Sequence, residues 1–541
     1  MLSSKRKLPP SLGAYNVYER IPKRGPITKR ATDPESIWQQ INPSQKLQWQ
    51  DCYPDNSGKV QCARLLVPLN YSIPFSARNQ ASIALIRNPS PYSQNSSDYK
   101  GPILFNPGGP GDSGVDSILT NAPNFRMILG DAFDLVGFDP RGISRSLPLA
   151  SIFNSDAAQS TFYSRLSAYS VMNASTNSIA EFVAGAHILG ELAEAAITGG
   201  YLGNINTEFT ARDMLTIVQA HGRDKLQYWG FSYGSVLGAT FAALFPDKVD
   251  RLIIDGVVDA DDYYQNAWNN SLIDTDKVMQ AFFDGCFAAG PSNCAFYASS
   301  PEAISQNLQK IYDSVASRPI SVVSNTTNSY GVVDYSFMRT YTFSGLYEPY
   351  IYFAPLAQLL AALFKGDGRP FWDFVQSKNA SVNIFNEEVA NLVITCNDGN
   401  LIPGTVDDAE AYFDGLRKSS QFADFWATNR LMCSGWPSLP KHFQGPFTVN
   451  TSFPLLLIGN TADPVTPLAN AKKMSAGFAG SVVLTQDAFG HTSLTAPSTC
   501  TAKYVRAYFE NGTLPPEGTV CPVLGSLFPV SGNGTDNTGN A

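Results

Sequence analysis

Short apolar runs, each bounded by glycine, proline, asparagine or aspartate, recur in the first half of the chain and again near its end. Near-continuous apolar runs of this kind are typical of strands that are buried on both faces of a mainly parallel sheet. We therefore predict eight strands, at 63–69, 81–86, 102–105, 133–138, 226–229, 249–254, 454–458 and 482–485.

Segments with helical periodicity separate several of these runs, for example at 179–196 and 211–220. The second segment follows Thr210-Ala-Arg-Asp213, which resembles a capping box with aspartate in place of glutamate and predicts a helix start there. Strands that alternate with helices predict an α/β fold. From about residue 260 to 395 the alternation stops and the chain is aromatic and helical, so we interpret this stretch as an insertion.

These patterns divide the chain into one α/β core that is interrupted by a helical cap. We expect a disordered basic segment at 1–35, the first part of the core at 36–260, the cap at 261–395, the second part of the core at 396–525 and a flexible polar tail at 526–541. No stretch approaches the roughly 18 consecutive apolar residues of a membrane-spanning helix, so we expect no membrane span.

The composition narrows the classes of function. The chain has 541 residues, of which 44% are apolar and 16% are charged, and this composition is globular rather than disordered. Its formal net charge is −8, whereas a nucleic-acid-binding domain presents a basic face. We therefore expect no nucleic-acid partner.

Cysteines and sequons both bear on the cellular compartment. The eight cysteines contain no C-x-x-C motif, which argues against zinc-ribbon and thioredoxin-like sites. Their even number suggests disulfides, and eight buried thiols are the alternative. The connectivity with the shortest loops is Cys52–Cys62, Cys286–Cys294, Cys396–Cys433 and Cys500–Cys521. Nine sequons are candidate glycosylation sites, at Asn70, Asn95, Asn173, Asn269, Asn325, Asn379, Asn450, Asn511 and Asn533. Both features favour a secreted glycoprotein.

The N-terminal segment gives no support for secretion. Residues 1–30 are basic and lack the apolar core of a signal peptide. The dibasic pairs at 23–24 and 29–30 are compatible with cleavage of a pro-segment. A disordered basic tail and a wrongly assigned start codon are the alternatives.

A candidate nucleophile lies in Gly230-Phe231-Ser232-Tyr233-Gly234, the single G-x-S-x-G motif of the chain. The predicted strand at 226–229 precedes it, and a helix rich in small residues is predicted at 235–245 after it. This context is typical of a sharp strand-to-helix turn that presents a serine hydroxyl above a sheet. The Tyr233 N–H would then face the developing oxyanion. The alternative is an ordinary turn with an incidental serine.

A glycine-rich loop, Asn106-Pro-Gly-Gly-Pro-Gly111, follows the predicted strand at 102–105. Glycines let the backbone approach a ligand closely, and we assign the Gly109 N–H as the second oxyanion donor. An ordinary tight turn is the alternative. A phosphate-binding loop is excluded because the motif does not end in Gly-Lys-Ser/Thr, so no nucleotide cofactor is expected.

A serine nucleophile requires a general base, and the chain offers only His187, His221, His442 and His491. His491 follows the last long predicted strand, where the chain order Ser–Asp–His places the base. Asp463, just beyond the strand at 454–458, would orient it and stabilise the imidazolium. Asp487 is the rival, although a solvated loop charge is the simpler interpretation of that residue.

Given these residues, the chain resembles the α/β-hydrolase superfamily and, more narrowly, the tripeptidyl-aminopeptidase-like and proline-iminopeptidase branch of serine exopeptidases. The resemblance spans about residues 47–525, and it is carried by the segments 49–71, 106–111, 134–142, 228–234, 394–398, 463–467 and 490–491. It implies an α/β-hydrolase fold with an inserted helical cap, a triad of Ser232, Asp463 and His491, an oxyanion hole at Tyr233 and Gly109, and no metal or cofactor. Proline iminopeptidases have histidine where this chain has Pro107, and no cap glutamate matches theirs.

We therefore expect acyl transfer to water through an acyl-enzyme. The leading substrate is the N-terminus of a short peptide, whose α-ammonium requires carboxylate partners, and Glu348 and Asp398 are the candidates. Asp398 could equally cap a helix or a turn. A carboxylesterase or lactonase acting on a small acyl substrate is the main alternative. A non-catalytic binding protein on a hydrolase scaffold is the remote one.

Overall fold

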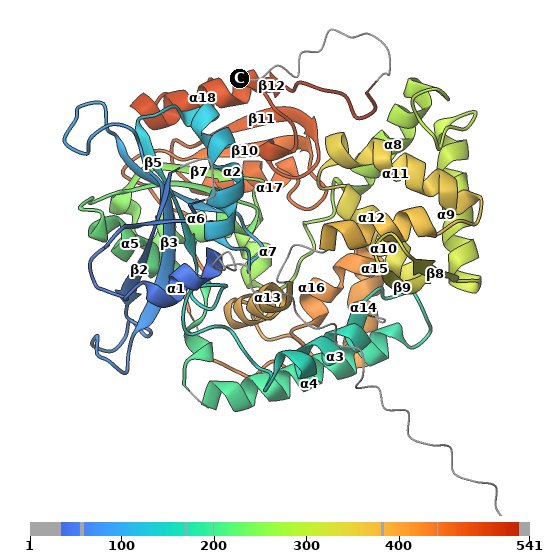
Figure 1. Ribbon diagram of the computed structural model, residues 1–541, viewed down its shortest axis with the longest axis horizontal. Helices are drawn as coiled ribbons and strands as arrows, with labels where there is room; N and C mark the ends of the chain where they lie inside the picture. Colours follow the sequence, from blue (N-terminus) through green and yellow to red (C-terminus); the bar gives the residue numbers. More distant parts are fainter. Residues whose placement is uncertain are drawn as a thin grey trace, which may run out of the picture. The chain divides into compact units, whose positions relative to one another are not determined.

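The computed structural model describes residues 34–54, 59–167, 170–198, 200–379, 384–440 and 442–529 (Figure 1). The chain divides into two compact units, 1–40 and 41–541. The first contains the short helices η1 (Pro34–Ser36) and α1 (Ile37–Gln40). Most of the predicted basic segment, most of the predicted polar tail and the sequon at Asn533 lie outside the described residues.

A ten-stranded sheet organises the second unit. Its strands lie in the order β1 (Gln50–Cys52), β2 (Val60–Val67), β3 (Ala81–Asn88), β5 (Phe133–Asp139), β4 (Gly101–Asn106), β6 (Leu226–Phe231), β7 (Val249–Asp255), β10 (Leu456–Ala462), β11 (Val482–Phe489) and β12 (Val520–Pro522). Strand β3 runs antiparallel to both neighbours, whereas all pairs from β5 to β12 are parallel. All eight predicted strands are present, and the α/β-hydrolase fold is confirmed.

Two pairs of helices pack on this sheet. Helix α2 (Gly114–Leu129) packs on α18 (Thr499–Asn511), and α5 (Thr207–Ala220) packs on α6 (Tyr233–Leu244). Helix α17 (Leu468–Gly477) lies against β10 and β11. The predicted capping box at Thr210–Asp213 is wrong, because α5 begins earlier, with Asn206 as its N-cap. Asp213 is instead buried in an ion pair with Arg141, in which Nη2 and Oδ1 are 2.7 Å apart.

The chain between β7 and β10 is mainly helical, as predicted. It contains α7 (Ala260–Tyr264), α8 (Thr275–Ala289), α9 (Pro301–Ser317), α10 (Tyr335–Gly345), α11 (Pro349–Phe364), α12 (Arg369–Asn379), α13 (Ile384–Asp398), α14 (Val406–Leu416), α15 (Ala423–Trp426) and α16 (Thr428–Leu431). A hairpin of β8 (Ile320–Ser324) and β9 (Ser329–Val333) was not predicted. The predicted cap boundary at residue 395 falls inside α13, and the division into domains stays a prediction.

Two helices from another part of the chain pack on this insertion. Helices α3 (Asp156–Leu166) and α4 (Ser178–Thr198) precede α5 in sequence. They lie beside α13 and α14 (Figure 1). The inserted helices therefore pack against a segment that lies between β5 and β6 in the sequence. Among the described helices, none combines the length and the apolar character that crossing a bilayer requires.

Four disulfides join the eight cysteines in the predicted shortest-loop pairs, Cys52–Cys62, Cys286–Cys294, Cys396–Cys433 and Cys500–Cys521. The alternative of eight buried thiols is therefore wrong. Disulfides persist in oxidising compartments, so the pairing indicates an extracellular location.

Candidate active site

Ser232 stands at the sharp turn between β6 and α6. Its φ of 55° and ψ of −123° are a strained combination for a residue with a side chain. The flanking glycines are required, because a Cβ on Gly230 would lie 2.4 Å from the Gly234 carbonyl oxygen. The Ser232 N–H donates to the Asp255 carbonyl (2.9 Å), which fixes the turn to β7. The geometry is that of a strand-to-helix nucleophile turn.

His491 and Asp463 meet at the carboxyl ends of the neighbouring strands β11 and β10. His491 Nδ1 lies 3.0 Å from each carboxylate oxygen of Asp463. Asp463 is fully buried and also accepts the N–H groups of Val465, Thr466 and Thr492. Burial by itself would raise its pKa, but His491 and these donors outweigh burial and lower it. An ionised carboxylate therefore faces the imidazole.

The other titratable candidates lie elsewhere. Asp487 is exposed and accepts the Thr461 hydroxyl (2.9 Å). His187 contacts the Gly404 carbonyl, and burial lowers the pKa of His221 to about 4. His442 lies beside Asn206. Of the four histidines, only His491 lines the cavity described next.

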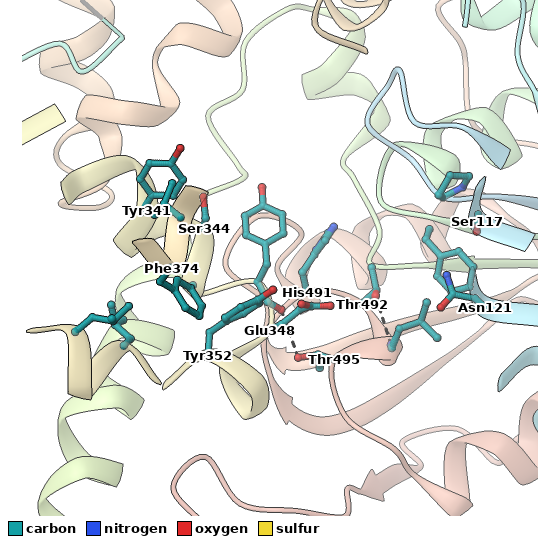
Figure 2. A pocket seen from close by; sticks show the side chains of 18 of the residues that line it. Ser117, Asn121, Tyr341, Ser344, Glu348, Tyr352, Phe374, His491, Thr492 and Thr495 are labelled. Atoms are coloured by element: carbon teal, nitrogen blue, oxygen red, sulfur yellow. Dashed lines mark hydrogen bonds between the residues drawn. The ribbon is translucent and has the colours of Figure 1, made fainter. Parts of the chain in front are cut away.

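A cavity of about 520 Å³ opens beside His491 (Figure 2). Helices α10, α11 and α12 supply most of one wall, which is aromatic and aliphatic, with Tyr341, Tyr352, Leu356, Phe371 and Phe374. The other side is formed by Ser117 and Asn121 of α2, by Pro107 and by Phe231. Because Phe231 directly precedes Ser232, the cavity reaches the nucleophile turn.

The glycine-rich loop covers the same turn. A Cβ on Gly108 would lie 2.9 Å from Ser232 Cβ and 3.3 Å from the Tyr233 nitrogen. Gly108 and Gly109 have positive φ values of 115° and 99°. The loop backbone thus reaches the place where an oxyanion would form, although the assignment of the Tyr233 and Gly109 N–H groups as donors stays a prediction.

Two carboxyl groups near the site were not predicted. Asp112 follows the glycine-rich loop, and desolvation by the surrounding protein raises its pKa. It acts electrostatically on His491 and Tyr347, both of which line the cavity. Burial and the nearby carboxylates, Asp112 first among them, raise the pKa of Glu387 on α13 to about 7. The acidic pair Glu387-Glu388 at a helix start is the sequence signal that could have found it.

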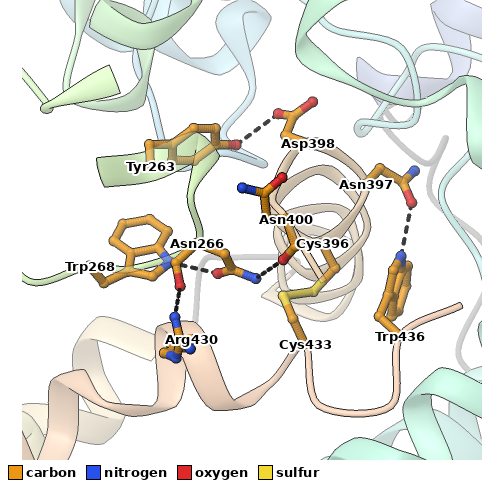
Figure 3. Close-up of a disulfide and its surroundings, with 10 residues drawn as sticks. All are labelled: Tyr263, Asn266, Trp268, Cys396, Asn397, Asp398, Asn400, Arg430, Cys433 and Trp436. Carbon is orange, nitrogen blue, oxygen red and sulfur yellow. Dashed lines mark hydrogen bonds between the residues drawn. A yellow bond between two sulfur atoms is a disulfide. The ribbon is translucent and has the colours of Figure 1, made fainter. Parts of the chain in front are cut away.

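The two predicted amine-binding candidates have different surroundings. Glu348, before α11, is exposed and lines the cavity. Asp398 is buried at the end of α13 and does not line the cavity (Figure 3). It accepts the Thr207 N–H (2.9 Å) and the Tyr263 hydroxyl (2.8 Å). Burial raises its pKa to about 6. Asp398 therefore anchors the start of α5, in line with the alternative that it is a cap.

A typical protein metal site requires several histidine, cysteine or carboxylate side chains close together. Within the described ranges, no group of three or more histidine, cysteine, aspartate or glutamate side chains is arranged to hold a metal ion. The hydrogen-bonded pair of His491 and Asp463 is of the kind that can act as a general base for a serine nucleophile.

Comparisons with known proteins agree with this geometry. A family described as "TAP-like protein" matches residues 419–521. The serine protease Hip1 of Mycobacterium tuberculosis is 28% identical over 506 residues, which cover 88% of this chain and 91% of that protein. The tripeptidyl aminopeptidase of Streptomyces lividans is 26% identical over 496 residues, with coverages of 88% and 86%. Carboxylesterase B of Mycobacterium tuberculosis is 26% identical over 481 residues, with coverages of 85% and 86%.

The matched region 419–521 contains Asp463 and His491, and the longer alignments extend over most of the chain. The chain is thus a serine hydrolase with the α/β-hydrolase fold, related to the tripeptidyl-aminopeptidase-like proteins.

Proposed function

We propose that this serine hydrolase is an exopeptidase that releases residues from the N-termini of short peptides. Ser232 attacks the scissile carbonyl, and His491 takes the hydroxyl proton and returns it to the leaving amine. Asp463 stabilises the imidazolium, and water hydrolyses the acyl-enzyme with His491 as base. Tyr233 and Gly109 donate to the oxyanion.

The observation that carries the exopeptidase assignment is a pair of carboxyls near His491: Asp112 interacts electrostatically with His491, and Glu387 with Asp112. Among the described residues, neither forms an ion pair with a lysine or arginine. Burial raises the pKa of Asp112, and burial together with nearby carboxylates raises the pKa of Glu387. A substrate α-ammonium would supply the missing positive charge. Glu348, which lines the cavity, is a second candidate partner.

The apolar wall of the cavity supports an apolar substrate side chain. Tyr341, Leu356 and Phe374 offer aromatic and aliphatic surface from three different helices. Burial of a substrate side chain against such a wall stabilises the complex in proportion to the apolar area removed from water.

A substrate panel tests the proposal. We expect aminoacyl-, prolyl- or tripeptidyl-amides with a free amine to be hydrolysed, and N-acetylation to lower kcat/KM about 30-fold or more, since it removes one partner of an enclosed charge pair. Glu387→Gln should raise KM for free-amine substrates and leave the N-acetyl series unchanged, with Asp487→Asn as the matched surface control. Turnover of short acyl esters alone would show that the peptidase assignment is wrong.

Carboxylesterase activity is the second candidate, favoured by the match to a carboxylesterase over 85% of the chain. The same acyl-enzyme chemistry serves esters. In that case the panel would show ester hydrolysis that is insensitive to a free amine and to Glu387→Gln.

We also propose that the protein is a secreted glycoprotein. The four disulfides support secretion. Among the sequon asparagines whose exposure the structure describes, six are exposed, as oligosaccharide transfer requires: Asn95, Asn173, Asn269, Asn325, Asn450 and Asn511.

A further inference from the structure

A buried aspartate outside the proposed triad contacts both the nucleophile turn and the loop that carries His491. Asp255 is the last residue of β7 and is fully buried. Strand β7 lies between β6, which leads to Ser232, and β10, which leads to Asp463. The Asp255 carbonyl accepts the Ser232 N–H at 2.9 Å. Its backbone therefore fixes the nucleophile turn.

The side chain of Asp255 fixes the histidine loop. Oδ1 accepts the Ser493 N–H (2.8 Å) and Oδ2 accepts the Ser493 hydroxyl (2.5 Å). Trp229 Nε1 donates a third, longer bond to Oδ2 (3.3 Å). Ser493 lies two residues after His491 and begins η5 (Ser493–Thr495). A bidentate bond at this point limits how far the loop can move.

Other contacts hold the same loop but do not reach the nucleophile turn. Asn460 donates to the carbonyls of Gly490 (2.8 Å) and Thr492 (2.7 Å). The His491 N–H donates to the Tyr347 carbonyl (2.7 Å). Among the described contacts of the loop, those of Asp255 alone also include Ser232.

We propose that Asp255 is a positioning residue for the hydrolytic reaction: it sets the distance between base and nucleophile by binding Ser493 through its carboxylate and Ser232 through its carbonyl, and its charge favours the imidazolium of His491. The inference rests on the proposed roles of Ser232 and His491. Four groups from different elements face or act on the imidazole: Asp463 after β10, Asp255 of β7, Asp112 after β4 and Tyr347 before α11. Asp255 and Asp112 thus add to the field of Asp463.

The pKa of Asp255 lies in a pH range that steady-state kinetics can cover. Burial raises its pKa to about 6, although the Ser493 and Trp229 donors and His491 partly offset burial. Above that pH the carboxylate accepts all three donors. Below it a proton occupies one oxygen, and the bidentate bond to Ser493 weakens.

Two variants separate charge from geometry. Asp255→Asn keeps the shape of the side chain but removes the charge and replaces one acceptor oxygen with an NH2 group, so we expect kcat to fall about tenfold or more with little change in KM. The acid limb of kcat/KM should move to lower pH, because the imidazolium loses a favourable charge. Ser493→Ala keeps the charge but loses one bond, so kcat should fall while the acid limb stays in place. Asp487→Asn, at an exposed carboxylate of β11, is the matched control and should behave as wild type.

The readouts are steady-state kinetics across pH on a substrate that wild type hydrolyses, labelling by a fluorophosphonate probe, and thermal unfolding. Asp255→Asn with a kcat within about twofold of wild type, or with an unmoved acid limb, overturns the proposal. If that variant does not fold, Ser493→Ala with wild-type kcat overturns it. Ser232→Ala distinguishes failure of the proposed function from failure of the proposed role of Asp255. If this variant is labelled as strongly as wild type, the proposed function is wrong. If it is not labelled, the result for Asp255→Asn tests the role of Asp255 alone.

Discussion

At the residue scale, Gly108 brings the glycine-rich loop into close contact with the nucleophile turn. Its Cβ would meet the Phe231 carbonyl oxygen at 2.7 Å and Ser232 Cβ at 2.9 Å, both shorter than real Cβ contacts. The φ of 115° is also a conformation that side chains rarely adopt. Space and conformation therefore both require glycine at the point where the loop crosses the nucleophile.

Gly108→Ala should lower kcat about 100-fold or more, because the loop must move away from the oxyanion position. Gly415→Ala is the matched control, since Gly415 lies in α14 with an ordinary φ and no atom near the new methyl group. We expect that control to keep wild-type kinetics. Steady-state kinetics decide the matter, and wild-type kcat in Gly108→Ala would show that the loop takes no part in the reaction.

Sequence reasoning proposed Ser232, Asp463 and His491 because each stands in a short motif after a predicted strand, and the structure joins the last two by a hydrogen bond. It missed Asp112, Glu387 and Asp255, because their significance depends on partners that are distant in sequence. Asp255 is 238 positions from Ser493. Asp398 shows the converse, because this candidate partner of the substrate α-ammonium binds Thr207 and Tyr263 in the interior.

At the scale of elements, the apolar runs predicted every long strand of the sheet but ended β10 and β11 too early. Buried polar residues lie at their carboxyl ends, where Asn460 and Gln486 break the apolar pattern. These side chains donate to the carbonyls of the His491 loop, Asn460 to Gly490 and Gln486 to Ser493. The apolar pattern therefore does not predict the carboxyl ends of these two strands, because the buried polar groups there are satisfied by tertiary hydrogen bonds.

A buried network joins three helices behind the nucleophile. Asp398 at the end of α13 accepts the Thr207 hydroxyl at the start of α5 (2.5 Å). The same hydroxyl lies 2.5 Å from the Tyr233 hydroxyl, on the first residue of α6. Tyr233 also carries the proposed oxyanion N–H, so the end of an inserted helix is linked to the reaction centre through one threonine.

Thr207→Val removes that shared hydroxyl and should lower kcat, because Tyr233 loses its link to α13. Thr240→Val is the control, since Thr240 is buried in α6 and pairs its hydroxyl with Tyr264 (2.8 Å) away from the nucleophile. Each variant should lose about 1–3 kcal/mol of stability from an unpaired buried hydroxyl. Kinetics and thermal unfolding together test this, and equal kcat losses in both variants would contradict a specific role for Thr207.

At the scale of the whole molecule, the disulfides close loops of very different length. Cys396–Cys433 spans 37 residues and ties the end of α13 to the region after α16 (Figure 3). Cys286–Cys294 spans only 8 residues beside α8. Because a cross-link stabilises mainly by restricting the unfolded chain, the longer loop contributes more.

The double variant Cys396→Ala/Cys433→Ala should therefore lose about 4 kcal/mol of unfolding free energy, against about 2.5 kcal/mol for Cys286→Ala/Cys294→Ala. Denaturant unfolding under non-reducing conditions measures both. A larger loss for the short loop would show that native packing, rather than loop length, sets the contribution.

The remaining two disulfides lie at the two edges of the sheet. The outermost strands β1 and β12 are only three residues long, and each carries a half-cystine, Cys52 bound to β2 and Cys521 bound to α18. Unpaired strand edges are templates for association with other chains, and short, tethered edges block such pairing. These two disulfides therefore protect the protein against aggregation as well as against unfolding. After their reduction, β1 and β12 can detach and expose the edges of β2 and β11. The protein could then aggregate while its catalytic core stays folded.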